Sequence, residues 1–242
     1  MNTLFSFERN RHMRNPLRLV TLRAGLLALV AVGAFVSAGN ATVVTLRSGN
    51  APVGQPDPLN TFLAEPSGAC GVGFGAAFTA ADFAAAETGP NATVVNPISV
   101  WLPSLACDST AKWISVNSNY GPVSTLFAQS FFIPAPCCID HAKLTLCWAV
   151  DDWLGDLDTF TNGGAYLNGV PLGISGGNYA VETSASVDVS QILHCGKNTL
   201  YMYDRDKGCA VSGLLYSASI EYVECRTSAN RATWGGIKSF YR

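Results

Sequence analysis

Hydrophobic and polar residues alternate with a period of two along much of the chain between residues 142 and 222. Leu144, Leu146, Trp148 and Val150 alternate with smaller or more polar side chains. Successive side chains of a β-strand point to opposite faces, so this period predicts a strand with one face in the core and the other outside it. A second run of the same kind shares one face through Leu214, Tyr216, Ala218, Ile220 and Tyr222.

Turn signals separate these strands. Asn168 and Gly169 can supply the two positive φ angles of a type I′ hairpin turn within residues 166–173. A further strand is predicted at residues 187–190, and residues 196–198 predict a turn before a strand at residues 199–203. Short strands joined by tight turns are typical of a β-sandwich or barrel.

The order of these strands and turns resembles the galactose-binding-domain-like jelly-roll β-sandwich family. The resemblance rests on residues 149–152, 166–173, 187–189, 196–200 and 212–214, with weaker matches at residues 111–115 and 131–134. It implies an all-β jelly-roll fold that is common in secreted glycan-binding and adhesive modules. Because the matching residues are turn and core positions, the resemblance implies no particular ligand.

One short helix is predicted upstream of the clear strands. Thr79 and Asp82 have the spacing of a capping box, and Gly89-Pro90 ends the helix. The glycines at residues 71–75 lack the preceding strand of a dinucleotide-binding loop and predict a bend. We therefore expect one β-sandwich domain over residues 42–225 with one helix, followed by a tail or final strand at residues 226–242.

The amino terminus predicts export. Five arginines precede an apolar run at residues 24–36, and Val36-Ser37-Ala38 has the small residues of a signal-peptidase site. The run is shorter than the roughly 20 apolar residues that span a bilayer, which disfavours a membrane anchor. We expect removal of residues 1–38 and a secreted, extracellular or cell-surface protein without a membrane span.

Net charge argues against nucleic acid as a partner. The full chain has a formal net charge of −2, and without the five arginines and one glutamate of residues 1–38 the remainder carries −6. Nucleic-acid binding requires basic side chains that neutralise phosphates, and no basic stripe follows the leader.

The eight cysteines all follow the predicted leader, so disulfides are expected. They are Cys70, Cys107, Cys137, Cys138, Cys147, Cys195, Cys209 and Cys225. Adjacent residues of a strand point to opposite faces, so Cys137 and Cys138 should have different partners. Cys147 should lie opposite the core face, where a bridge would hold a neighbouring segment or another subunit. Zinc is disfavoured because no C-x-x-C pair is present.

Two motifs raise enzyme hypotheses. Residues 173–177 fit G-x-S-x-G, but a nucleophile elbow needs a strand before the serine and a helix after it. Here a hairpin precedes and a strand follows, and only Asp188 and His194 approach the remaining triad order. A glycosidase would need two carboxylates at a defined separation, and the aspartates of residues 151–158 could supply them. Nothing in the sequence marks one of these aspartates as the acid and another as the base. We expect a protein that is not an enzyme, with a hydrolase as a remote alternative.

The loop at residues 151–160 is the densest acidic and aromatic segment. Carboxylates accept hydrogen bonds from sugar hydroxyls, and an indole face packs on a pyranose, so Asp152, Trp153, Asp156 and Asp158 predict a glycan site. The same three aspartates could hold Ca²⁺, the one cofactor that the sequence suggests. A third reading is a solvated loop in which Trp153 caps the core. The charges at residues 204–208 predict a self-compensated turn.

Two function classes follow from these features. The first is a secreted, non-catalytic module that binds a glycan or surface polymer through its end loops. The second is a structural subunit of an extracellular matrix or filament, in which copies of the chain join by strand addition.

Overall fold

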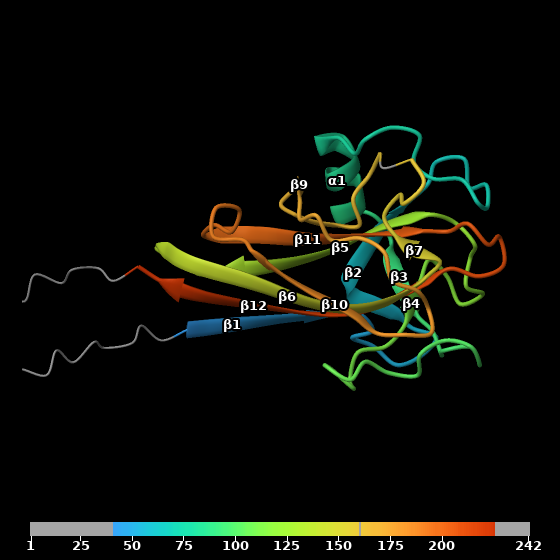
Figure 1. The fold of residues 1–242 in the computed structure, drawn as a ribbon, viewed down its shortest axis with the longest axis horizontal. Helices are drawn as coiled ribbons and strands as arrows, with labels where there is room; N and C mark the ends of the chain where they lie inside the picture. The colour runs from blue at the N-terminus through green and yellow to red at the C-terminus, as the bar shows by residue number, and fades with distance from the viewer. Residues whose placement is uncertain (1–40, 160, 226–242) are drawn as a thin grey trace, which may run out of the picture. The chain divides into compact units, whose positions relative to one another are not determined.

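The computed structural model describes residues 41–159 and 161–225, which form an antiparallel β-sandwich of jelly-roll type with one short helix (Figure 1). The predicted leader at residues 1–38 and tail at residues 226–242 lie outside the described residues. In chain order the elements are β1 Ala41–Arg47, β2 Pro56–Ala64, α1 Ala80–Glu87, β3 Asn91–Val94, β4 Ile114–Ser115, β5 Thr125–Ile133, β6 Ile139–Asp151, β7 Trp153–Leu154, β8 Ala165–Leu167, β9 Val170–Pro171, β10 Thr183–Asp188, β11 Gly196–Arg205 and β12 Gly213–Glu224.

The described strands belong to one curled sheet that folds back on itself. Its order is β10-β6-β12-β4-β3-β2-β5-β11-β8-β9, with β1 added to β12 and β7 added to β11. Strands β10, β6, β12 and β1 make one layer, and β2, β5, β11 and β8 make the other (Figure 1). The short strands β3 and β4 connect the two layers at one end of the molecule.

The alternating run in β6 faces the core between the layers, as predicted. Leu144, Leu146, Trp148 and Val150 are all buried, and they belong to the same hydrophobic cluster as Leu200 and Met202 of β11. Complete burial of one such aliphatic or aromatic side chain stabilises the fold by about 1.5–3 kcal/mol. This cluster is the main core of the sandwich.

The opposite face of β6 is also buried, which the alternation did not predict. Cys147 and Ala149 pack in a second cluster with Trp101, Leu105 and Trp113. The two indole rings stack with their centroids 4.2 Å apart. The expectation that this face lies outside the core was wrong, because the long connection between β3 and β4 folds over it and supplies the aromatic side chains.

The predicted helix is α1, and its amino terminus has the predicted capping box. The Thr79 side chain accepts from the Asp82 backbone N–H, and the Asp82 carboxylate accepts from the Thr79 N–H at 2.8 Å. Phe83 and Ala86 of the helix pack on tyrosines of β8 and β11. The helix therefore covers the outer face of the β5–β11–β8 layer (Figure 1).

One of the two predicted turns is confirmed and the other is wrong. Asn168 and Gly169 have φ angles of 53° and 79° and join β8 to β9, which confirms the predicted hairpin. The turn predicted at residues 196–198 is wrong, because β11 already begins at Gly196 and its Lys197 pairs with Phe132 of β5. The Asn198 side chain donates to the carbonyls of His194 and Gly196, so it closes the preceding turn while its backbone joins the strand.

All eight cysteines are paired, as expected. The bridges are Cys70–Cys209, Cys107–Cys147, Cys137–Cys195 and Cys138–Cys225. Adjacent Cys137 and Cys138 have different partners, as predicted, and Cys147 holds the segment that covers the second face of β6. Four disulfides are typical of proteins from oxidising compartments. The described part of the chain contains no helix with the length and hydrophobicity needed to cross a membrane.

Candidate functional site

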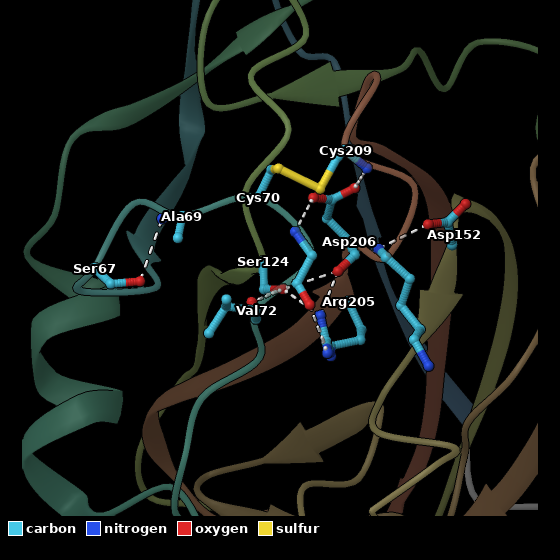
Figure 2. Close-up of a disulfide and its surroundings, with 11 residues drawn as sticks. Ser67, Ala69, Cys70, Val72, Ser124, Asp152, Arg205, Asp206 and Cys209 are labelled. Atoms are coloured by element: carbon cyan, nitrogen blue, oxygen red, sulfur yellow. Dashed lines mark hydrogen bonds between the residues drawn. A yellow bond between two sulfur atoms is a disulfide. The ribbon is translucent and has the colours of Figure 1, made fainter.

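The predicted loop lies where β6 ends, against the end of β11. Residues Trp153 and Leu154 form the short strand β7, which pairs with Arg205 and Asp204 of β11. This pairing brings the acidic residues 151–158 together with the charged residues 204–209, which are about fifty residues away in the sequence. The Cys70–Cys209 bridge ties a third segment to the same place (Figure 2).

Three of the four predicted site residues meet around Lys207. Its ammonium lies 2.8 Å from the Asp158 carboxylate and 4.5 Å from the centroid of the Trp153 ring. Its backbone N–H donates to the Asp152 carboxylate at 2.7 Å. The hydrogen bond from Lys207 lowers the pKa of the exposed Asp158. The loop therefore presents an indole, two carboxylates and an ammonium in one small cluster, which we call the Lys207 cluster.

Asp156 is separated from this cluster because its side chain points into the protein. It is only 4% exposed and accepts a hydrogen bond from the Tyr203 hydroxyl at 3.1 Å. The Arg205 Nε lies 3.2 Å from the same oxygen, at ion-pair distance but without hydrogen-bond alignment. Arg205 also donates to Ser124 and to the Gly71 carbonyl. Asp156 thus belongs to a buried network that joins three chain segments.

Calcium binding by the loop stays a prediction. The carboxylates of Asp152, Asp156 and Asp158 do not gather within 4.8 Å of one another; in the described residues only Cys107, Cys147 and Glu182 form such a group, and its two cysteines are bridged to each other. Ca²⁺ takes roughly six to eight oxygen ligands. The loop offers two carboxylates outside the core, and both already accept hydrogen bonds from Lys207.

A group of buried acids behind the loop was missed by the sequence reasoning. Asp151 accepts from the Trp101 indole at 2.7 Å, and Asp204 accepts from the Ser212 hydroxyl at 2.7 Å. Asp206 accepts from the backbone of Gly71 and Cys209 beside the disulfide (Figure 2). The expected self-compensated turn at residues 204–208 is therefore wrong. Its first three side chains are buried and bond to other segments, which a local charge pattern cannot reveal.

Two of these acids hold a proton more strongly than an exposed aspartate does. Burial, together with the neighbouring Asp152, raises the pKa of Asp151 to about 7. The hydrogen bond from Trp101 opposes this shift. Burial also raises the pKa of Asp204, opposed by the hydrogen bond from Ser212. The carboxyl group of Asp151 is thus poised to change charge near neutral pH.

The raised pKa of Asp151 predicts that stability falls as pH rises. Between pH 4 and 7 the folded chain holds a proton that the unfolded chain has released, so the free energy of unfolding declines across this window. One pKa unit of difference corresponds to about 1.4 kcal/mol, which sets a ceiling of about 4 kcal/mol for this group. Urea unfolding at several pH values measures the slope.

The control for this prediction is Asp151→Asn, which is neutral at every pH and keeps an acceptor for Trp101. The pKa values of Glu87, Asp108 and Asp188 are lowered in the folded chain, so the stability that these groups contribute is lost as pH falls. All three groups are present in both proteins, so they affect both profiles alike. The variant should therefore show the smaller decline between pH 4 and 7. Identical profiles for the two proteins would contradict the assignment.

The residues of the enzyme hypothesis are not assembled into a triad. Residues 173–177 lie in the irregular segment between β9 and β10, where Gly176 forms an isolated bridge with Leu154 and its carbonyl accepts from the Trp148 indole at 2.9 Å. Asp188 accepts from Ser190, and the His194 ring lies 3.0 Å from the Cys195 carbonyl. The segment after Ser175 is not a helix, so the context of a nucleophile elbow is missing, and the motif lies in irregular structure with one bridge rather than in a simple turn.

Comparison with protein-family models and with curated proteins finds no match for this chain. Among solved structures, it is similar to a Stig cyclase from Fischerella sp. TAU at 10% identity and a TM-score of 0.38, covering 76% of this chain and 100% of the other. It is also similar to a family 35 carbohydrate-binding module from Clostridium thermocellum at 14% identity and a TM-score of 0.28, covering 53% of this chain and 90% of the other. These values assign neither a family nor a ligand to the chain.

Proposed function

We propose that this chain is an exported, non-catalytic module that binds a glycan or a surface polymer through the loops at one end of its sandwich. The observation that carries the proposal is the Lys207 cluster, in which Trp153 lies beside Asp158 and Asp152 at the edge of the protein. An aromatic face with hydrogen-bonding groups around it suits a pyranose, which has an apolar C–H face and a rim of hydroxyls.

The cluster can exchange its internal contacts for contacts with a ligand at little cost. Lys207 and Asp158 are both substantially exposed, and an exposed ion pair contributes only about 0–1 kcal/mol. A sugar that packs on Trp153 displaces the ammonium from the ring. Lys207 can then donate to sugar hydroxyls, while Asp152 and Asp158 accept from them.

Substitution of Trp153 tests this proposal. A glycan array on the exported chain identifies a ligand, and calorimetry then measures its affinity for Trp153→Ala, which should be about tenfold weaker, or about 1.4 kcal/mol. Tyr179→Ala is the matched control, because Tyr179 is an exposed aromatic outside the cluster. Thermal melts establish that both variants are folded. Equal affinity of folded Trp153→Ala and wild type would remove the end loop as the binding surface.

An open sheet edge supports the second candidate function, a self-assembling structural subunit. β1 pairs with β12 on one side and with no described strand on the other, and its Val43 is 57% exposed. An unpaired edge can accept a strand from another chain. Long polymers of the purified chain would favour this alternative, whereas a discrete monomer that binds glycans favours the first.

A further inference from the structure

Phe132 is the most exposed large hydrophobic side chain in the described part of the molecule. Its side chain is 65% exposed on β5, far from the Lys207 cluster in sequence, and its strand partner is Lys197 of β11. A single exposed hydrophobic residue is ordinary on a protein surface. The residues around Phe132 distinguish it from an ordinary exposed hydrophobic residue.

Lys197, the strand partner of Phe132, belongs to a polar group of balanced charge. Lys197 forms an ion pair with Glu87 at the end of α1, and the Tyr201 hydroxyl donates to the same carboxylate. Ser130 precedes Phe132 by two residues on β5, and its hydroxyl lies 3.0 Å from that of Thr199. These side chains offer hydrogen-bond donors and acceptors without a net charge.

Glu87, the ion-pair partner of Lys197, also lines a groove beside the helix. The groove has a volume of about 420 Å³ and is lined by residues of α1, the β8–β9 turn and β11. Its lining comprises Phe78, Ala80, Phe83, Ala84, Glu87, Asn168, Gly169 and Tyr201. This volume is within the range of about 300–1,000 Å³ that is usual for small-molecule sites. Glu87 thus lines the groove and contacts the strand partner of Phe132.

The charge state of Glu87 is set by its neighbours. Burial raises the pKa of Glu87, but hydrogen bonds from Lys197, Tyr201 and Thr199 outweigh burial and lower the pKa overall. The carboxylate is therefore ionised at neutral pH and balances the ammonium of Lys197. The pair carries no net charge, so it gives neither an anionic nor a cationic sugar a net electrostatic advantage, and its hydrogen-bonding groups suit an uncharged ligand.

We propose that Phe132 and the helix-side groove form a second saccharide site, which takes an uncharged hexose unit of the glycan. The hexose packs its C–H face on the Phe132 ring, and its hydroxyls bond with Glu87, Lys197 and Ser130. The next unit of the chain enters the groove against Phe78 and Phe83. This inference rests on the proposed function and adds to it a ligand class and a second contact surface.

The test compares the two surfaces on the same panel of probes. The exported chain is titrated with soluble oligosaccharides of neutral hexoses and with a polyuronate, and affinities are measured for wild type and Phe132→Ala. Phe132→Ala should weaken binding of the neutral oligosaccharide about tenfold without a change in melting temperature, because the ring is exposed. Val43→Ala is the matched control, an exposed hydrophobic residue on the other layer.

A second variant probes the polar rim. Glu87→Gln keeps the shape of the side chain but leaves Lys197 without its counter-ion, so binding should shift from the neutral oligosaccharide toward the polyuronate. A structural role alone would change the melting temperature of this variant without changing its ligand preference. Equal preference in folded Glu87→Gln and wild type would overturn the assignment of an uncharged ligand.

The outcomes separate this inference from the proposed function. Weakened binding in Trp153→Ala, with Phe132→Ala equal to wild type, would overturn the second site and leave the end-loop site standing. A loss of saccharide binding in Phe132→Ala alone supports the second site and rules out the end loop as a binding surface. A wild-type chain that binds no saccharide overturns both. If Phe132→Ala instead abolishes concentration-dependent self-association, the ring is an interface between copies, and the saccharide site is overturned.

Discussion

Reduction of the four disulfides should unfold this protein at room temperature. The bridges close loops whose ends are 139, 40, 58 and 87 residues apart. In the chain-entropy model each of these loops alone corresponds to about 4–5 kcal/mol. A folded domain has a net stability of only about 5–15 kcal/mol, so the loss of several bridges exceeds what the core can supply.

Thermal melts with and without a reducing agent measure this effect, and mass spectrometry of proteolytic fragments confirms which cysteines are paired. Cys107→Ser with Cys147→Ser isolates one bridge, and its loss should free the segment that carries Trp101 and Trp113 from the second face of β6. Retention of the native melting temperature in a chain shown to be fully reduced would contradict the prediction.

Asp156→Asn should be the most damaging single change in the predicted ligand loop, and the damage should be to stability. The substitution keeps the side-chain volume but removes the charge that faces Arg205 in the protein interior. Loss of one partner from a buried ion pair costs about 3–5 kcal/mol, because the remaining charge is left without compensation. The midpoint of urea unfolding should fall accordingly.

Asp158→Asn is the control within the same loop. Its carboxylate is exposed and pairs with Lys207, so the change should leave the unfolding midpoint nearly unchanged while it weakens glycan binding. The opposite result, a stable Asp156→Asn protein with impaired binding, would place Asp156 in the ligand site after all. Binding measurements on both variants, corrected for the folded fraction, therefore divide the loop into its supporting and its ligand-contacting parts.

The features that the sequence determined by itself depend on neighbours within a few residues. The alternation in β6 reflects the geometry of an extended backbone, and the capping box of Thr79 and Asp82 spans a single helical turn. Asn168 and Gly169 tolerate positive φ angles by their own chemistry. Cys137 and Cys138 have separate partners, as predicted, although they lie in the connection between β5 and β6 and not in a strand.

The placement of the acidic residues was decided only by the tertiary structure. Asp152, Asp156 and Asp158 are equivalent in the sequence, yet Asp156 meets Arg205 in the interior while Asp158 meets Lys207 at the surface. Both cations come from β11 and the loop after it, nearly fifty residues later, and they reach the loop only because β7 pairs with β11. The Trp101 indole that bonds to Asp151 comes from fifty residues earlier.

Contacts of this kind cannot be read from local patterns, because an aspartate has the same propensities whether a distant segment brings it an arginine, a hydroxyl or solvent. The same reason explains why the second face of β6 was expected outside the core: its small side chains are compatible with solvent until the segment with Trp101 and Trp113 covers them. Local sequence sets the direction in which a side chain leaves the backbone, and long-range packing sets what it meets there.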